Sequence, residues 1–172
     1  MKVRLKASEI DMSIRIAKTT SRMSRATGLP NLRVDTSRSD LDVEILGVQS
    51  EMVARKALGM SYGFSEMGPD SGADIFVDCG KKELRVQVKG AFTPNGNLLF
   101  PKHSKFEWQV AMLVCKTEED DLFDVPGFIG VKKAQEVMVE KDLGHGAGWF
   151  VGREHLSSLG ALMEWIQEER LS

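Results

Sequence analysis

Hydrophobic and polar residues alternate in two neighbouring stretches, residues 73–78 and 83–89, and this alternation is typical of half-buried β-strands. A turn at Gly80-Lys81 between them pairs Ile75 with Val86 and collects the apolar side chains of both strands on one face. A slip of one residue would mix the two faces. The pattern therefore predicts both a β-hairpin and its register.

Apolar spacing elsewhere predicts a larger fold around this hairpin. Residues 30–43 are polar and irregular and are predicted as a loop. Strands and helices follow one another without strict alternation, which favours the α/β class: a mixed β-sheet of about four to five strands flanked by helices. The predicted helices are 9–26, 46–58 and 154–169, and the predicted further strands are 108–115, 124–132 and 149–151.

The length of 172 residues fits a single domain. Within it we expect a basic N-terminal helix and loop (1–45), a core (46–132), and a C-terminal strand and helix (133–172). No run approaches the roughly 18 apolar residues of a membrane helix, and the N-terminus lacks the apolar centre of a signal peptide. Two cysteines form no disulfide framework. These features predict a cytoplasmic protein without a membrane partner.

The net charge of −2 conceals a strong asymmetry along the chain. Residues 1–40 hold nine Lys and Arg against four Asp and Glu, a net charge of +5. Residues 116–172 hold six against twelve, a net charge of −6. The total excludes a uniformly basic nucleic-acid coat, whereas the basic front is compatible with an anionic partner.

Two groups of basic residues are candidates for contact with nucleic acid. The first lies at spacings of three and four along one face of the predicted helix 9–26, and this spacing is compatible with either a solvated face or a phosphate-binding arm. The second follows the hairpin, where a histidine either lines a substrate groove or is an ordinary surface residue. The candidates are Arg15, Lys18, Arg22 and Arg25 in the first group and Lys102 and His103 in the second.

Polar side chains converge on the second face of the hairpin. The predicted register places Asp74 directly opposite Gln87, at a Cβ separation of about 4.5–5.5 Å, with Lys89 diagonally adjacent. The carbonyl of Val88 can point into the same patch. A few oxygen ligands, completed by water and phosphate, are what a hard divalent cation requires. Glu51 lies on or beside the core-facing stripe of the preceding helix and can reach this patch.

The order of these residues resembles the PD-(D/E)XK nuclease superfamily. The similarity extends over residues 45–130 and is strongest to members with a Gln-x-Lys motif, including Holliday-junction-resolvase-like and small phage-encoded nucleases. Asp74, rather than Asp70 of the literal Pro69-Asp70, corresponds to the family aspartate, since Asp74 faces Gln87. The residues that carry the resemblance are Gly47-x-x-x-Glu51, Gly72-Ala73-Asp74-Ile75 and Val86-Gln87-Val88-Lys89-Gly90.

The resemblance implies a restriction-endonuclease-like core and a Mg²⁺-dependent deoxyribonuclease that hydrolyses phosphodiesters by metal-activated water. It implies that Asp74, Gln87, the Val88 carbonyl and Glu51 hold Mg²⁺, with Mn²⁺ as a substitute, and that Lys89 activates the water. DNA is the expected partner, with a homodimer as a candidate assembly.

Plainer interpretations remain open beside this one. Gln87 replaces an acidic family residue, which allows a catalytically inactive DNA- or protein-binding accessory protein of a phage or mobile element. Asp74 and Lys89 alone fit an exposed cross-strand ion pair worth roughly 0–1 kcal/mol. Glu51 alone fits a helix salt bridge with Arg55, four residues later.

Overall fold

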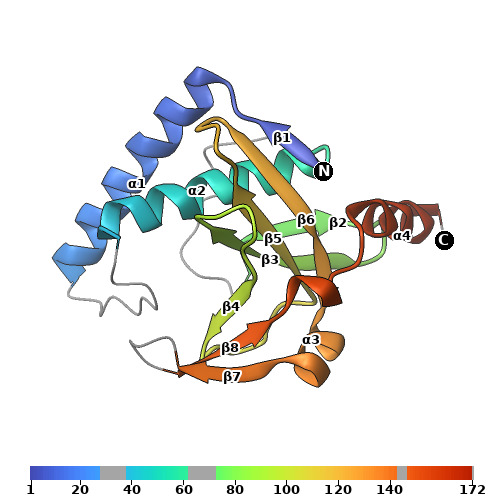
Figure 1. The fold of residues 1–172 in the computed structure, drawn as a ribbon. Helices are drawn as coiled ribbons and strands as arrows, with labels where there is room; N and C mark the ends of the chain where they lie inside the picture. The colour runs from blue at the N-terminus through green and yellow to red at the C-terminus, as the bar shows by residue number, and fades with distance from the viewer. Residues whose placement is uncertain (28–37, 62–72, 143–146, 172) are drawn as a thin grey trace.

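The computed structural model describes residues 1–27, 38–61, 73–142 and 147–171 (Figure 1). Its helices are α1 (Ala7–Thr27), α2 (Asp40–Ala57), α3 (Val131–Val137) and α4 (Leu159–Leu171), with a short 3-10 turn η2 (Arg153–His155). Its strands are β1 (Lys2–Arg4), β2 (Ile75–Asp78), β3 (Glu83–Ala91), β4 (Leu98–Pro101), β5 (Val110–Lys116), β6 (Leu122–Gly130), β7 (Val139–Asp142) and β8 (Ala147–Val151). No helix in these ranges combines the length and apolar character needed to cross a bilayer.

The central sheet of the described residues has five strands in the order β1-β6-β5-β3-β2. It is mixed, because β3 and β5 run parallel while the other neighbouring pairs are antiparallel. This confirms the predicted α/β class and the expected mixed sheet. The hairpin register is also confirmed, since Ile75 pairs with Val86 and Val77 pairs with Leu84. Gly80 adopts a φ of 82° in its turn, a conformation that glycine accommodates without strain.

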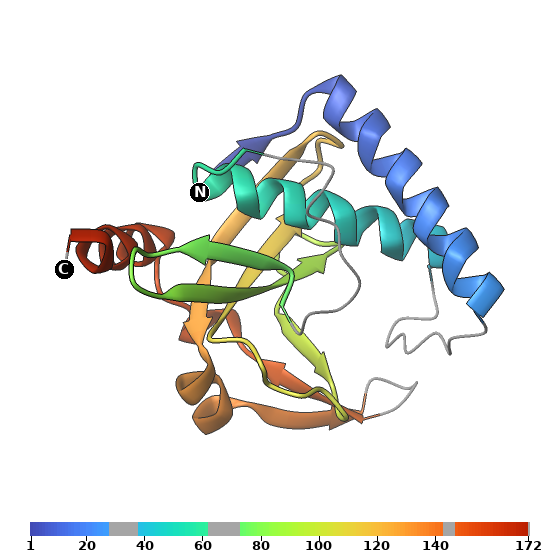
Figure 2. The same cartoon turned by 180° about the vertical axis from the view of Figure 1, so that it is seen from behind.

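Helices cover one face of this sheet. α2 packs across β3 and β5, α1 packs on α2, and α4 contacts β6 (Figures 1 and 2). The strand β5 is buried on both faces, which explains its almost continuous apolar sequence. Its Val110, Met112 and Val114 join the helix-covered core. Its Ala111 and Leu113 enter a second core on the opposite face.

A second sheet that the sequence did not predict covers the opposite face. Among the described residues it has three strands in the order β4-β8-β7. Leu98 and Phe100 of β4 and Val151 of β8 are fully or almost fully buried in the second core. The strand at 149–151 was predicted, but β4, β7 and β1 are each three or four residues long and carry too little pattern to identify.

The predicted start of the second helix, residue 46, is wrong. α2 begins at Asp40, so residues 40–43 of the predicted loop are helical, whereas residues 30–37 lie outside the described ranges. Ser39 caps this helix, because its hydroxyl accepts a hydrogen bond from the Asp42 amide at 3.2 Å. Asp40 and Asp42 add negative charge to the first turn, where the helix dipole favours it.

The predicted start of the last helix, residue 154, is also wrong. Residues Arg153–His155 form the turn η2, and Ser157 pairs with Phe128 of β6 in an isolated β-bridge. α4 therefore begins only at Leu159, beyond the backbone hydrogen bonds that tie Ser157 to the sheet. The helical spacing of apolar residues does not reveal a tertiary pairing of this kind.

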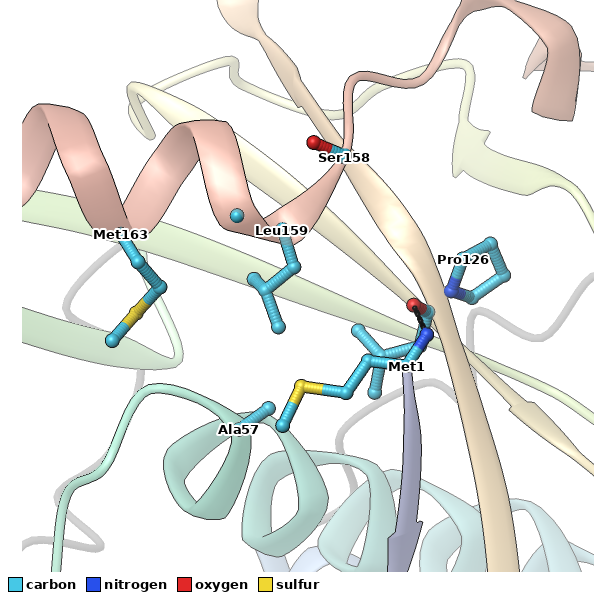
Figure 3. A pocket seen from close by; sticks show the side chains of 8 residues that line it. Met1, Ala57, Pro126, Ser158, Leu159 and Met163 are labelled. Carbon is cyan, nitrogen blue, oxygen red and sulfur yellow. Dashed lines mark hydrogen bonds between the residues drawn. The ribbon is translucent and has the colours of Figure 1, made fainter.

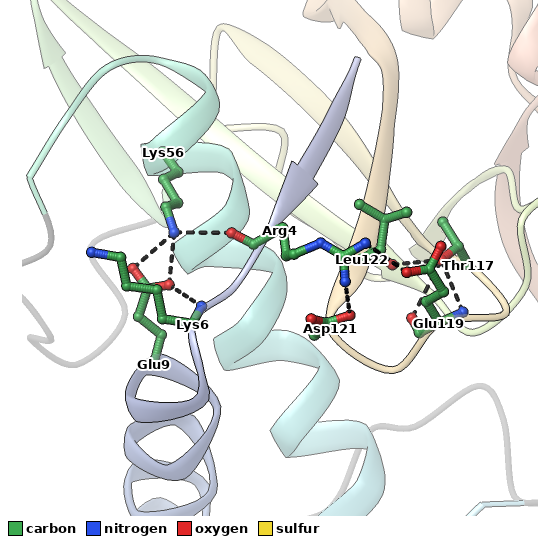
Figure 4. A network of polar contacts seen from close by, with 8 residues as sticks. All are labelled: Arg4, Lys6, Glu9, Lys56, Thr117, Glu119, Asp121 and Leu122. Atoms are coloured by element: carbon green, nitrogen blue, oxygen red, sulfur yellow. Dashed lines mark hydrogen bonds and ion pairs between the residues drawn. The ribbon is translucent and has the colours of Figure 1, made fainter.

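Polar contacts fasten the N-terminal strand and helix to the rest of the fold (Figure 4). Lys56 of α2 donates to the carbonyl of Arg4 at 3.0 Å and to the carboxylate of Glu9 at 2.7 Å. The guanidinium of Arg4 pairs with Glu119 at 2.6 Å and with Asp121 at 2.5 Å in the turn before β6. These contacts join β1 and α1 to both α2 and the central sheet.

The close approach of α2 to β3 depends on a glycine. A Cβ atom at Gly90 would lie 2.5 Å from the Ser50 hydroxyl oxygen and 2.9 Å from Leu46 Cγ. Both distances are below the sum of van der Waals radii, so a side chain there would require the Ser50 and Leu46 side chains, or the helix that carries them, to shift. Glu51 and Lys89 are the immediate chain neighbours of this contact, which therefore fixes their relative placement.

We expect Gly90→Ala to lower the free energy of unfolding by about 1–3 kcal/mol, the usual cost of overpacking. Gly47→Ala is the matched control, because a Cβ there meets no atom within 4 Å. In the interior of α2 this control should be stabilising by about 0.5–1 kcal/mol. Urea unfolding of the two variants measures both effects, and a Gly90→Ala protein as stable as the control would contradict the packing argument.

Candidate functional site

A cleft of about 580 Å³ lies between the open face of the β2–β3 hairpin and the loop that follows β4. Asp74, Gln87 and Lys89 line it together, as the hairpin register predicts. Gln87 pairs with Ala111 in β5, so these side chains lie on the face that carries the second sheet. The remaining lining residues are Ala73, Phe100, His103, Ser104, Lys105, Glu107 and Trp108.

Asp74 is tied to β3 by its carboxylate and its backbone. One carboxylate oxygen accepts hydrogen bonds from the side-chain nitrogen of Gln87 and, at 2.6 Å, from the backbone amide of Val88. The Asp74 amide donates to the Val86 carbonyl at 3.0 Å. The amide and carbonyl of a strand residue point to the same edge. The Val88 carbonyl therefore faces the edge of β3 on which Asp74 lies.

Lys89 is half-buried with its ammonium group above an aromatic ring. Its Nζ atom lies 5.7 Å from the centre of the Phe100 ring, within the range of a cation–π contact. Burial lowers the pKa of Lys89, and the nearby negative charge of Asp74 partly opposes this shift. The ammonium therefore gives up its proton more readily than a solvated lysine does.

Glu51 is a half-buried carboxylate on α2, as its position beside Val48, Ala54 and Leu58 predicts. It does not line the cleft, but it lies close enough to Asp74 to sense its charge. Burial and this repulsion raise the pKa of Glu51 to about 7, while Arg55 acts in the opposite direction. Two carboxylates thus repel each other at the base of the hairpin.

The donor set suits a hard cation better than a soft one. Within the described residues, no three His, Cys, Asp or Glu side chains gather into a metal-binding group. Asp74 and Glu51 offer two carboxylates whose repulsion a divalent cation would relieve, and Val88 offers a carbonyl. Oxygen ligands, few of them charged, match Mg²⁺, which keeps several of its waters. Gln87 could add its amide oxygen only after turning its side chain, because its nitrogen now donates to Asp74.

The residues predicted to contact DNA do not form one surface in the structure: some lie on α1 and one lines the cleft. Arg15, Lys18 and Arg22 are exposed on α1, whereas the side chain of Arg25 is outside the described part of the structure. Lys102 is not among the lining residues of the cleft and forms an ion pair with Glu140 at 2.6 Å. His103 does line the cleft.

Sequence reasoning missed the polar side chains of the loop after His103. Ser104, Lys105 and Glu107 line the cleft and face the hairpin. A signal was present in the sequence, because Phe106 and Trp108 alternate with these polar residues. Such alternation predicts a segment with one buried edge and one open edge.

A second hollow of about 380 Å³ lies away from these residues, beside the start of α4 (Figure 3). Met1, Ala57, Leu159 and Met163 contribute to its walls. Its described lining contains no titratable side chain, and we therefore assign it no chemistry.

Comparison with family models and curated proteins gives no match, so the functional assignment depends on the geometry of the site. No protein-family model matches this chain, and no curated protein matches it in sequence.

We expect Glu51→Gln to raise the melting temperature at pH 8 and to change it much less at pH 5. The pKa of Glu51 is raised from 4.5 to about 7, so the native state binds this proton more tightly than the unfolded chain. The resulting stability is present below pH 4.5 and is lost as the pH rises through about 7. Glutamine removes the charge that is costly at pH 8.

Thermal unfolding at the two pH values measures this difference. Glu164→Gln on the exposed surface of α4 is the control and should have little effect at either pH. An equal shift for Glu51→Gln at pH 5 and pH 8 would show that its carboxylate is not buried beside a like charge.

Proposed function

We propose that this protein is a Mg²⁺-dependent deoxyribonuclease of the PD-(D/E)XK superfamily, with a restriction-endonuclease-like core. The observation that carries the proposal is the convergence of Asp74, Gln87 and Lys89 on one cleft, with Glu51 close enough to repel Asp74. The arrangement of elements also supports it. A helix that carries the glutamate precedes a hairpin whose second strand continues beside a parallel strand.

In this proposal Asp74, Glu51, the Val88 carbonyl and the amide oxygen of Gln87 hold the Mg²⁺ ion, and Mn²⁺ can replace it. When bound, the ion supplies positive charge beside the scissile phosphate and makes water more acidic. Asp74 keeps its orientation through the Val88 amide, which donates to it at 2.6 Å. The site is thus organised by the backbone of β3 before substrate arrives.

Lys89 orients the attacking water and stabilises the negative charge that grows on the phosphate. Its place above the Phe100 ring, 5.7 Å from the ring centre, keeps the ammonium group within the cleft. Its lowered pKa suits proton transfer better than that of a solvated lysine, because catalytic groups work best with a pKa near the operating pH. The oxygen of water forms a bond to phosphorus, one P–O bond of the backbone breaks, and the leaving oxygen takes up the proton that the water gives up.

One observation favours a second candidate, a catalytically inactive protein that binds DNA or another protein. Gln87 donates its amide hydrogen to Asp74, and this neutral partner satisfies the carboxylate without a cation. This candidate predicts salt-dependent DNA binding that survives Asp74→Ala. It also predicts that binding requires Arg15 and Lys18, which are exposed on α1.

Cleavage of plasmid and branched DNA tests the nuclease proposal. The wild-type protein should cut in Mg²⁺ and stop when EDTA removes the ion. Lys89→Ala should reduce the rate by about 10²–10⁴-fold, the usual contribution of a positioned proton-transfer group. Arg85→Ala is the matched control, because Arg85 lies on the same face of β3 and outside the cleft.

Equal rates for the wild type and Lys89→Ala would refute the role of Lys89. Absence of cleavage across several DNA structures, together with DNA binding that survives Asp74→Ala, would favour the inactive candidate.

A further inference from the structure

The loop between β4 and β5, residues 102–109, forms the wall of the cleft that faces the hairpin. It comes from a different part of the chain than Asp74 and Lys89, and it lines the same hollow. Any phosphate held near those residues therefore meets this loop from the opposite side.

Aromatic packing holds this loop in place. Phe106 contacts Phe100 edge-on, with ring centres 5.7 Å apart, and contacts Trp108 in the same way at 5.6 Å. Phe100 and Trp108 are stacked at 5.3 Å. Gln109 at the end of the loop is hydrogen-bonded to β3. Its side-chain oxygen accepts from the backbone amide of Arg85 at 2.8 Å, and its backbone amide donates to the Arg85 carbonyl at 2.9 Å. The wall is thus preorganised.

The same cluster supports both walls of the cleft. Lys89 lies over one face of Phe100, and Phe100 packs on the rings that anchor the loop. Phe100 and Trp108 of this cluster line the cleft, and so do polar residues of the loop. Ser104 and Lys105 lie there, with His103 preceding them and Glu107 following.

Two lysines of this loop have different surroundings. Lys102 lies outside the cleft lining and is neutralised by Glu140 at 2.6 Å. Lys105 lines the cleft and is exposed, and it forms no salt bridge with any described residue. An ammonium group with no carboxylate partner at the edge of a cleft is available to an anion from outside.

The charged side chains of the cleft lie on both of its walls. Asp74 and Lys89 line the hairpin side of the cleft, and Lys105 and Glu107 line the loop side. The two negative and two positive side chains therefore balance in the absence of a cation. A divalent ion at Asp74 would leave the cleft positive, and the serine hydroxyl and ammonium group of the loop would then face the added charge.

We propose that Ser104 and Lys105 bind a backbone phosphate of DNA next to the one that reacts. This assignment takes its ligand from the proposed function, and it adds a specific phosphate-binding wall to the site. Lysine serves such a contact as a point charge with three donors, and serine adds a short hydrogen bond. Binding is therefore stronger when a divalent cation is present.

DNA binding by the full chain tests this assignment separately from cleavage. A short fluorescein-labelled oligonucleotide is titrated in Ca²⁺ and in EDTA, with fluorescence anisotropy as the readout and a gel to verify that it stays intact. In Ca²⁺, Lys105→Gln should raise Kd by about 3–10-fold and should reduce the slope of log K against log salt by about one. Ser104→Ala should raise Kd by about 2–10-fold.

Lys102→Gln is the matched control and should change Kd by less than about twofold, since its charge is already paired. Each variant should melt at the wild-type temperature. Equal losses for Lys105→Gln and Lys102→Gln would overturn the assignment, as would a wild-type protein that does not bind the oligonucleotide. A deoxynucleoside monophosphate that binds as tightly as the oligonucleotide would also overturn it, by indicating a free-nucleotide site.

The two proposals fail in different ways. A wild-type protein that binds DNA through Lys105 but does not cleave it would contradict the nuclease alone. A protein that cleaves DNA equally well with and without Lys105, and binds it equally well, would contradict the phosphate-binding wall alone.

Discussion

The register of the β2–β3 hairpin joins the core of this protein to its candidate site. The pairing that buries Ile75 against Val86 also brings Asp74 beside Gln87 on the opposite face. Because side chains alternate along a strand, a slip of one residue would turn the charged groups toward the core and the apolar groups toward the cleft. Burial of an unpaired charge is costly, so the hydrophobic core itself enforces the geometry of the polar face.

Close packing then adds the helix to this arrangement. Gly90 lets α2 approach β3, and Glu51 on that helix comes near Asp74. The nearness is unfavourable in the isolated protein, since burial and like charge raise the pKa of Glu51 to about 7. A site that holds carboxylates together against their repulsion is less stable than a neutral one, and a bound cation would offset that cost. The pair Glu51 and Asp74 thus lowers the stability of the protein and serves its proposed function.

Much of this could be read from the sequence, and the exceptions have physical causes. Strict alternation in residues 73–89 was enough for the hairpin, its register and the facing of Asp74 and Gln87. The second sheet was missed because β4 and β7 have only four residues each, and because β4 forms its pairs with β8, which is far away in the chain. Alternation with Phe106 and Trp108 marks the segment of Lys105 as half-buried, but its place opposite the hairpin is set only when the chain has folded. The orientation of the Gln87 amide is likewise set by its partner.

In the proposed function, Asp74, Glu51, Gln87 and the Val88 carbonyl surround a single divalent cation. Crystals grown with Mn²⁺ test it most directly, because this ion substitutes for Mg²⁺ and scatters anomalously. We expect an anomalous peak within bonding distance of Asp74, with the Gln87 side chain turned so that its oxygen faces the ion. Crystals saturated with Mn²⁺ that show no peak beside Asp74, and in which Gln87 still donates to it, would contradict the proposed metal site.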